Sequence, residues 1–422
     1  MRSARKQTTR AAGFLLALVA AALPATPALA EPLQAAPVAR SELAVLCQEQ
    51  PNASNPITET PWEQTRLQYD RVHAFATGRD VSVAVVDTGV WASHPQLESA
   101  IDPTRESASF ARDAVAATLD CDPDGHGTRV AGIIAARPSA DTRFQGIAPN
   151  ARILPVRVTN SQDEGTAGAL AEGINHAVDQ GVDIINVSVL TNSEFGDVVD
   201  AVKRALDNDI IVVTAAGNTG GDQEGNAKTW PAELARKPGF EGLIVVGATN
   251  QDGTLAPFTT TSVPASIAAP GVQVTGPAVI RGHNRQDGTS FAAPLVSGTA
   301  ALVLEAYGKD QTPLEVKRRL QLTADHPGAD MPAEGLGFGV VNPYEAVTAI
   351  LPESSAAPAT PEAGIKPIAA QAAPDTTARD VALIVSGSAV GLALITLGSV
   401  ATYRRGRDRN WQPSQERPQA LG

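Results

Sequence analysis

The chain has 422 residues, of which 43% are hydrophobic, and a formal net charge of -12. This length suffices for one large domain with extensions or for two domains, and the acidic balance argues against a nucleic-acid-binding surface. The two cysteines, Cys47 and Cys121, suit either one disulfide or two buried thiols until the compartment is known.

The first thirty residues have the pattern of an export signal. Four basic residues precede an apolar run over 11–23, and Ala28-Leu29-Ala30 then offers small residues where a signal peptidase cleaves. An uncleaved anchor is the alternative, but the apolar run is short and two prolines follow it. We therefore predict a signal peptide over 1–30.

The next segment, 31–79, is proline-rich with little periodicity and is predicted to be an extended N-terminal arm. An apolar, β-branched run over 81–86 follows and predicts a buried central strand. Asp87 stands at its carboxyl end, which is where ligands bind in open α/β sheets. A turn or helix-capping aspartate is the structural alternative.

His126 lies between two glycines, at the entrance to a small, apolar run over 130–136 that predicts a buried helix. A histidine with so little steric cover is a poor candidate for a packed core residue. A metal ligand is the other possibility, but no second histidine stands four residues away and the other five are scattered.

Beyond His126, strand and helix patterns alternate. Strands are expected at 153–158, 182–189, 210–215, 243–248 and 267–269, and helices at 166–180 and 195–208. This alternation predicts an α/β fold with a doubly wound, mostly parallel sheet and helices on both faces. Asn218 follows one strand end and could be a plain turn former.

Ser290, in Gly288-Thr289-Ser290, precedes a helix-compatible run through Leu304. An ordinary helix cap is the usual role of such a serine. At a helix start, however, the hydroxyl is exposed beside free backbone N–H groups and the positive end of the helix dipole, which suits a nucleophile. Thr312, Pro313 and Glu315 mark a further helix start.

The end of the chain predicts a membrane anchor. A Pro/Ala-rich linker over 352–380 leads to a charge-free apolar stretch over 381–403, which is long enough to cross a bilayer, and a short basic tail over 404–422 follows. The positive-inside rule places that tail in the cytoplasm and everything between the signal peptide and the apolar stretch outside. A buried core helix is the alternative, which the composition of the linker disfavours.

Asp87, His126 and Ser290 together supply the three roles of nucleophilic acyl transfer. The serine would attack a carbonyl, the histidine would take and return its proton, and the aspartate would orient the imidazole. The carboxamide of Asn218 could stabilise the oxyanion of the tetrahedral intermediate.

These segments resemble the subtilisin-like serine proteases. The matching motifs are Asp87-Thr88-Gly89, His126-Gly127-Thr128, Ala216-Gly217-Asn218 and Gly288-Thr289-Ser290. The resemblance covers about 81–349 and implies a triad of Asp87, His126 and Ser290, with an oxyanion hole made by Asn218 and the Ser290 backbone. Ser188 matches the family strand that pairs with substrate and lines the first specificity pocket.

The chain departs from the family pattern in ways that carry further expectations. Gln96 stands where many relatives have a calcium-ligating aspartate, so we predict no essential metal and no cofactor. The small glycines that commonly follow the Ser188 position are replaced here by Val189, Leu190 and Thr191, and this bulk should narrow the cleft. The arm is too short for the usual folded inhibitory prodomain, so self-cleavage of such a domain is not expected to control activity.

The whole architecture is similar to the mycosins, membrane-anchored proteases associated with type VII secretion. This resemblance implies protein substrates that are few and secreted, and membrane components of a secretion complex as partners. Outside the cytoplasm, Cys47 and Cys121 should form a disulfide that ties the arm to the loop before His126.

We therefore predict a membrane-anchored extracytoplasmic serine endopeptidase. The alternative function is a structural subunit that stabilises the secretion complex, with proteolysis secondary. The anchor and the narrowed cleft disfavour a broad degradative protease.

Overall fold

The computed structural model describes residues 47, 53–113, 115–160, 166–191, 194–220, 228–328, 331–351 and 395–409. The chain divides into two units, Met1–Leu351 and Pro352–Gly422. The predicted signal peptide, linker and most of the basic tail lie outside the described residues, as do the arm before 53 apart from Cys47 and the first part of the apolar stretch, 381–394.

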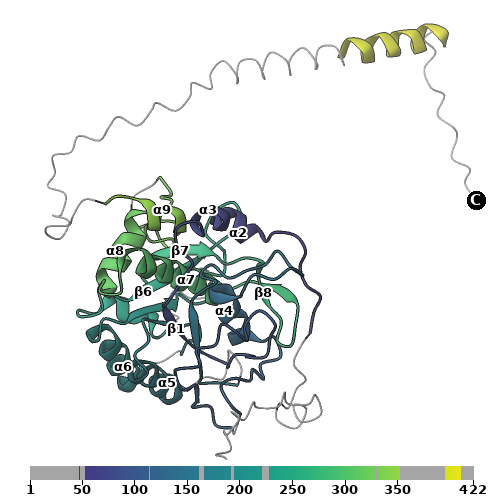
Figure 1. The fold of residues 1–422 in the computed structure, drawn as a ribbon. Helices are drawn as coiled ribbons and strands as arrows, with labels where there is room; N and C mark the ends of the chain where they lie inside the picture. The colour runs from purple at the N-terminus through teal and green to yellow at the C-terminus, as the bar shows by residue number, and fades with distance from the viewer. Residues whose placement is uncertain are drawn as a thin grey trace, which may run out of the picture. The chain divides into compact units, whose positions relative to one another are not determined.

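A seven-stranded sheet with the strand order β2-β3-β1-β4-β5-β6-β7 forms the centre of the first unit (Figure 1). All six pairings within it are parallel. The strands are β1 (Ser82–Asp87), β2 (Ala108–Ser109), β3 (Arg152–Arg157), β4 (Ile184–Val187), β5 (Ile211–Ala215), β6 (Ile244–Thr249) and β7 (Ile267–Pro270). The predicted parallel α/β architecture is confirmed.

Helices cover both faces of this sheet, as the continuous apolar strands require. Val83 and Val85 of β1 pack in one core cluster with α4 (His126–Ala135) and α7 (Thr289–Tyr307). The alternate residues, Ala84 and Val86, pack in a second cluster with α5 (Ala167–Asp179) and α6 (Gly196–Asp207). The two-residue period of a strand thus divides β1 between two cores.

α7 is the central helix of the larger core, and 16 of its 19 residues are buried. It is also the one helix among the described residues that is long and apolar enough to span a membrane. Its burial inside the unit explains that composition. The helix predicted after Thr312 is present as α8 (Pro313–Leu322), with the expected capping box between Thr312 and Glu315.

The segment before β1 differs from the extended arm that we expected. It contains two short helices, α2 (Trp62–Arg66) and α3 (Tyr69–Val72), and the side chains of Leu67, Tyr69 and Val72 enter the larger core. Helices of four or five residues contain little more than one turn, so the apolar pattern does not repeat within them and the sequence shows little sign of them.

Several short elements also had no clear sequence signal. They are an antiparallel hairpin of β8 (Val274–Pro277) and β9 (His283–Gln286), a 3-10 helix at Ala232–Arg236, and α9 (Pro343–Thr348). The hairpin leads directly into the turn before Ser290, so it helps to place that residue.

In the second unit, residues 395–408 are helical. The helix therefore continues past Tyr403, the predicted end of the apolar stretch, into the basic run. Its large apolar side chains, Ile395, Leu397, Val400 and Tyr403, are exposed.

Candidate active site

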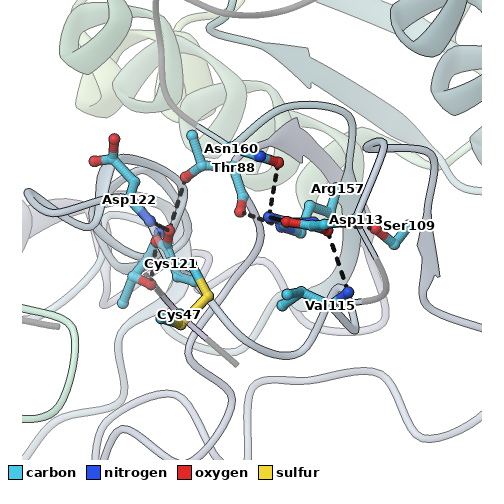
Figure 2. The surroundings of a disulfide bond; sticks show 11 residues. Cys47, Thr88, Ser109, Asp113, Val115, Cys121, Asp122, Arg157 and Asn160 are labelled. Atoms are coloured by element: carbon cyan, nitrogen blue, oxygen red, sulfur yellow. Dashed lines mark hydrogen bonds and ion pairs between the residues drawn. A yellow bond between two sulfur atoms is a disulfide. The ribbon is translucent and has the colours of Figure 1, made fainter. Parts of the chain in front are cut away.

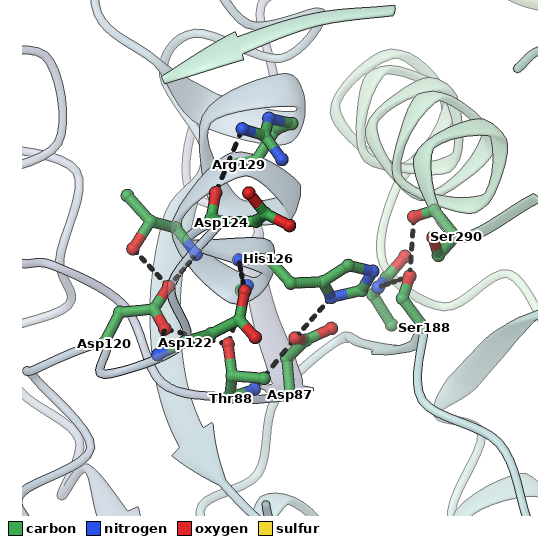
Figure 3. Close-up of polar contacts among 12 residues, drawn as sticks. Asp87, Thr88, Asp120, Asp122, Asp124, His126, Arg129, Ser188 and Ser290 are labelled. Atoms are coloured by element: carbon green, nitrogen blue, oxygen red, sulfur yellow. Dashed lines mark hydrogen bonds and ion pairs between the residues drawn. The ribbon is translucent and has the colours of Figure 1, made fainter. Parts of the chain in front are cut away.

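Asp87 and His126 lie in direct contact. Asp87 ends β1 and His126 begins α4, and the imidazole Nδ1 is 2.7 Å from the Oδ1 of Asp87 (Figure 3). Both side chains are buried, with exposures of 0% for Asp87 and 2% for His126. The backbone N–H of Thr88 also donates to this carboxylate oxygen at 2.8 Å, which fixes its direction.

The charge state of His126 follows from this contact. Burial acts to lower the pKa of the imidazole, but the charge and hydrogen bond of Asp87, together with the charge of Asp122, raise it above the ordinary value for histidine. When neutral, the ring donates Nδ1–H to Asp87 and leaves Nε2 as a lone-pair acceptor. Nε2 is buried and has no hydrogen-bond partner, so it is free to accept a proton.

Ser290 belongs to a third element, α7, separate from β1 and α4, which carry Asp87 and His126. It is the second residue of α7, and Figure 3 shows the imidazole extending from α4 toward it. The ring of the following residue, Phe291, lies 5.1 Å from the His126 ring, centroid to centroid. The Ser290 carbonyl accepts a hydrogen bond of 2.9 Å from the Ser188 hydroxyl, which ties the start of α7 to the end of β4.

Asn218 lies beside the same turn. Its Oδ1 accepts hydrogen bonds from the backbone N–H and the hydroxyl of Thr289, both at 2.9 Å. The amide group of Asn218 is therefore oriented with its NH2 directed away from Thr289. A Cβ built on Gly288 would lie 3.0 Å from the Ser290 Oγ and 3.5 Å from the Asn218 Nδ2. The donor and the hydroxyl thus flank one small space, which the absence of a side chain at 288 leaves open.

Glycines allow the aspartate and histidine segments to meet. A Cβ on Gly127 would be 2.2 Å from the Gly89 carbonyl oxygen and 3.1 Å from the Asp87 Cβ. Gly89 itself has a φ of +107°, and a Cβ there would be 2.1 Å from the Leu119 carbonyl oxygen. Both positions exclude other residues because backbone approaches within contact distance.

The predicted substrate-binding residues occupy different environments. Ser188 is buried in a chain of hydrogen bonds with Asn186 that reaches α7. Val189 is also buried and packs in the core cluster under α5 and α6, whereas Leu190 is partly buried. Leu190 therefore has accessible surface for narrowing the cleft, whereas Val189 does not.

A pocket of about 330 Å³ opens beyond the carboxyl ends of β2 and β3. It is lined by Phe110, Ala111, Arg112, Val158, Thr159, Asn160, Thr166 and Ala169. Its two walls come from segments about fifty residues apart, so no local sequence pattern pointed to it.

Gln96, where the calcium ligand of relatives was expected to be replaced, is buried and its amide is fully engaged. Its Nε2 donates to the carbonyl oxygens of Arg137 and Phe144 at 2.7 and 2.9 Å, and its Oε1 lies 2.7 Å from the His283 Nε2. The described residues contain no group of three or more His, Cys, Asp or Glu side chains suited to a metal ion. Independence from metal stays a prediction.

The predicted disulfide between Cys47 and Cys121 is present, with a Cα–Cα distance of 5.2 Å. Figure 2 shows it beside Thr88 and Asp122, close to the segment that leads to His126. The arm is thus covalently tied to the site.

Sequence reasoning missed several residues that support the site. Asp122 accepts the backbone N–H of His126, the first residue of α4, at 3.0 Å. The buried guanidinium of Arg157 donates to the Thr88 carbonyl at 3.1 Å and pairs with Asp113. Asp120 accepts hydrogen bonds from Thr88, next to Asp87, and from Thr128, two residues after His126. The proximity of Asp120 and Asp122 to the His126 motif was an available signal, whereas Arg157 had none.

The profile of the subtilase family matches residues 78–339. Mycosin-1 of Mycobacterium tuberculosis is 31% identical over 395 residues, covering 82% of this chain and 86% of that protein. Subtilisin DY of Bacillus licheniformis is 34% identical over 269 residues, covering 64% of this chain and 92% of that protein.

Solved structures give the same result. A crystal structure of MycP1 from Mycobacterium smegmatis is 27% identical with a TM-score of 0.59, and covers 72% of this chain and 90% of that one. A structure of the MycP3 protease from the type VII (ESX-3) secretion system is 28% identical with a TM-score of 0.58, and covers 71% of this chain and 90% of that one.

Proposed function

The chain belongs to the subtilase family and is a serine endopeptidase of the mycosin type, and from this premise we propose that Asp87, His126 and Ser290 are its catalytic triad. The observation that carries the proposal is the 2.7 Å contact between the His126 Nδ1 and Asp87, which leaves a buried Nε2 without a partner. An imidazole held in this tautomer is ready to act as a general base.

In the proposed reaction, the Ser290 Oγ attacks the carbonyl carbon of the scissile peptide bond and gives its proton to the His126 Nε2. The imidazolium then forms beside the Asp87 carboxylate, which stabilises its positive charge. His126 returns the proton to the leaving amine, and an acyl-enzyme remains on Ser290. Water, deprotonated by His126, releases the acyl group and restores the serine.

The oxyanion hole would consist of the Asn218 NH2 and the Ser290 backbone N–H. Thr289 holds the Asn218 Oδ1 in place before substrate arrives, so the amide donor does not have to reorganise during the reaction. Its position across Gly288 from the Ser290 Oγ fits a donor directed at the developing oxygen charge.

We propose that the substrates are few secreted proteins of a type VII secretion system. The support is the similarity to mycosins, including one structure described as a protease from such a system. An N-terminal export signal and a membrane helix starting near 381 would place the catalytic unit outside the membrane, held by one C-terminal span. The exposed apolar side chains of the described helix at 395–408 suit a lipid environment.

A structural role in the secretion complex is the second candidate. The fold and the partly buried Leu190 do not decide between these functions, because a protease fold can also serve for docking. The complete Asp87–His126–Ser290 set favours catalysis, and both roles could be combined in one chain.

The test is labelling of the full-length protein in membranes by a fluorophosphonate probe. We expect the wild type and a Ser139→Ala control, changed in the loop after α4, to be labelled, and Ser290→Ala to be unlabelled. An unlabelled wild type would refute the catalytic proposal. In cells, secretion that survives Ser290→Ala but is lost on deletion of the protein would favour the structural role.

A further inference from the structure

Asp120 is a fully buried carboxylate that joins the segment of Asp87 to the segment of His126 (Figure 3). Its Oδ1 accepts the hydroxyl proton of Thr88, at 2.9 Å, and the Asp122 backbone N–H, at 3.2 Å. Its Oδ2 accepts the backbone N–H and the hydroxyl of Thr128, at 2.8 and 2.6 Å. Thr88 directly follows Asp87, and Thr128 is two residues after His126.

Both threonine hydroxyls donate to Asp120, so its side chain acts only as an acceptor. The Thr88 hydroxyl already accepts the Gly127 N–H at 2.9 Å, and the Thr128 hydroxyl accepts the Trp91 N–H at 2.9 Å. The single proton of each hydroxyl is therefore directed to Asp120. Because all four partners of the carboxylate are donors, a protonated acid or an amide would set one donor against another.

We propose that ionised Asp120 is a positioning residue for peptide hydrolysis, which holds the turn after β1 against the start of α4 and so maintains the contact between Asp87 and His126. This inference rests on the triad proposed above. Asp120 touches neither His126 nor Asp87 through its side chain, so it acts through Thr88 and Thr128. A displacement of about 1 Å between reacting groups can slow catalysis about 100-fold.

The groups around Asp120 determine when it is ionised. Burial raises its pKa to about 6, hydrogen bonds from Thr128 and Thr88 oppose this rise, and the charge of Asp122 adds to it. Arg129 of α4 is a nearby cation, and the negative charge of Asp120 acts to raise its pKa. The buried guanidinium of Arg157 is a second one, which donates to the Thr88 carbonyl. Asp120 therefore becomes protonated at a lower pH than His126, whose pKa is raised above its ordinary value. At acid pH the loss of activity should therefore depend on two protonations instead of one.

The test compares the second-order rate of fluorophosphonate labelling of the full-length wild type and Asp120→Asn between pH 5 and 8. We expect Asp120→Asn to be labelled about 100-fold more slowly at pH 8. The slope of log rate against pH should approach two for the wild type near pH 5 and one for Asp120→Asn. Thermal unfolding at each pH confirms that both proteins are folded.

Asp102→Asn is the matched control. Asp102 is also a buried aspartate that accepts the backbone N–H and hydroxyl of a threonine, Thr104, at 2.9 and 2.6 Å. Its own N–H binds the Ile153 carbonyl near the start of β3, at the sheet edge opposite Asp87. We expect this variant to lose stability but to keep the wild-type labelling rate and pH slope.

A second pair of variants covers the case in which Asp120→Asn does not fold. Thr88→Ser keeps the hydroxyl and should keep the labelling rate, whereas Thr88→Val should lose it. Labelling of Asp120→Asn at the wild-type rate, an equal loss in Asp102→Asn, equal rates for the two Thr88 variants, or a wild-type slope of one would each overturn the inference. A wild type that takes no label would instead refute the triad itself.

Discussion

The disulfide should supply a large part of the stability of the catalytic unit, and the structure allows its size to be worked out. Cys47 and Cys121 are separated by 74 residues. In the chain-entropy model, closing a loop of this length in the unfolded chain stabilises the folded state by about 4 kcal/mol. The entropy of unfolding of a unit of roughly 300 residues is about 0.6 kcal/mol per kelvin, so removing the bond should lower Tm by about 7 °C.

The perturbation is the double variant Cys47→Ser/Cys121→Ser, compared with the wild type by calorimetry with and without reductant. Reductant should lower the Tm of the wild type toward that of the variant and leave the variant unchanged. A Tm difference below about 1 °C would refute the reasoning, because the entropy of a constrained loop would then be absent or cancelled by strain. An equal response of the variant to reductant would show that the effect does not come from this bond.

Two further predictions concern the site and its surroundings. Asn218→Ala should lower kcat about 10²- to 10³-fold on a cleaved peptide while KM changes little, since the amide donor acts on the transition state; an equal effect on KM and none on kcat would contradict its role. Burial lowers the pKa values of His94 and His283 to about 4, below the ordinary value of about 6.5. As the pH falls, these histidines therefore take up protons in the unfolded state before they do so in the folded state. The free energy of unfolding should fall between about pH 6.5 and 4, by up to about 1.4 kcal/mol per pH unit for each histidine. Urea unfolding at pH 7 and 4.5 checks this, and a double variant with glutamine at both positions should show a smaller decrease; an unchanged decrease would exclude these histidines as its cause.

Much of the fold could be predicted because the relevant information is local. The continuous apolar run before Asp87 required a strand buried on both faces, and the alternation of such runs with helical patterns required a parallel sheet. The helix start at Thr312 followed from a capping box within four residues. By contrast, the helices at Trp62–Arg66 and Tyr69–Val72 were missed, since they are stabilised by packing in the core and not by their own pattern.

The sequence by itself determined the chemical types and the order of Asp87, His126, Asn218 and Ser290, because each belongs to a short motif with its own local geometry. Only the tertiary structure decided how these motifs meet. The contact between Asp87 and His126 joins residues 39 positions apart, and it depends on glycines that let two backbones approach and on a buried carboxylate at Asp120. Such distant contacts arise from the close packing of whole elements, so no pattern of neighbouring residues records them.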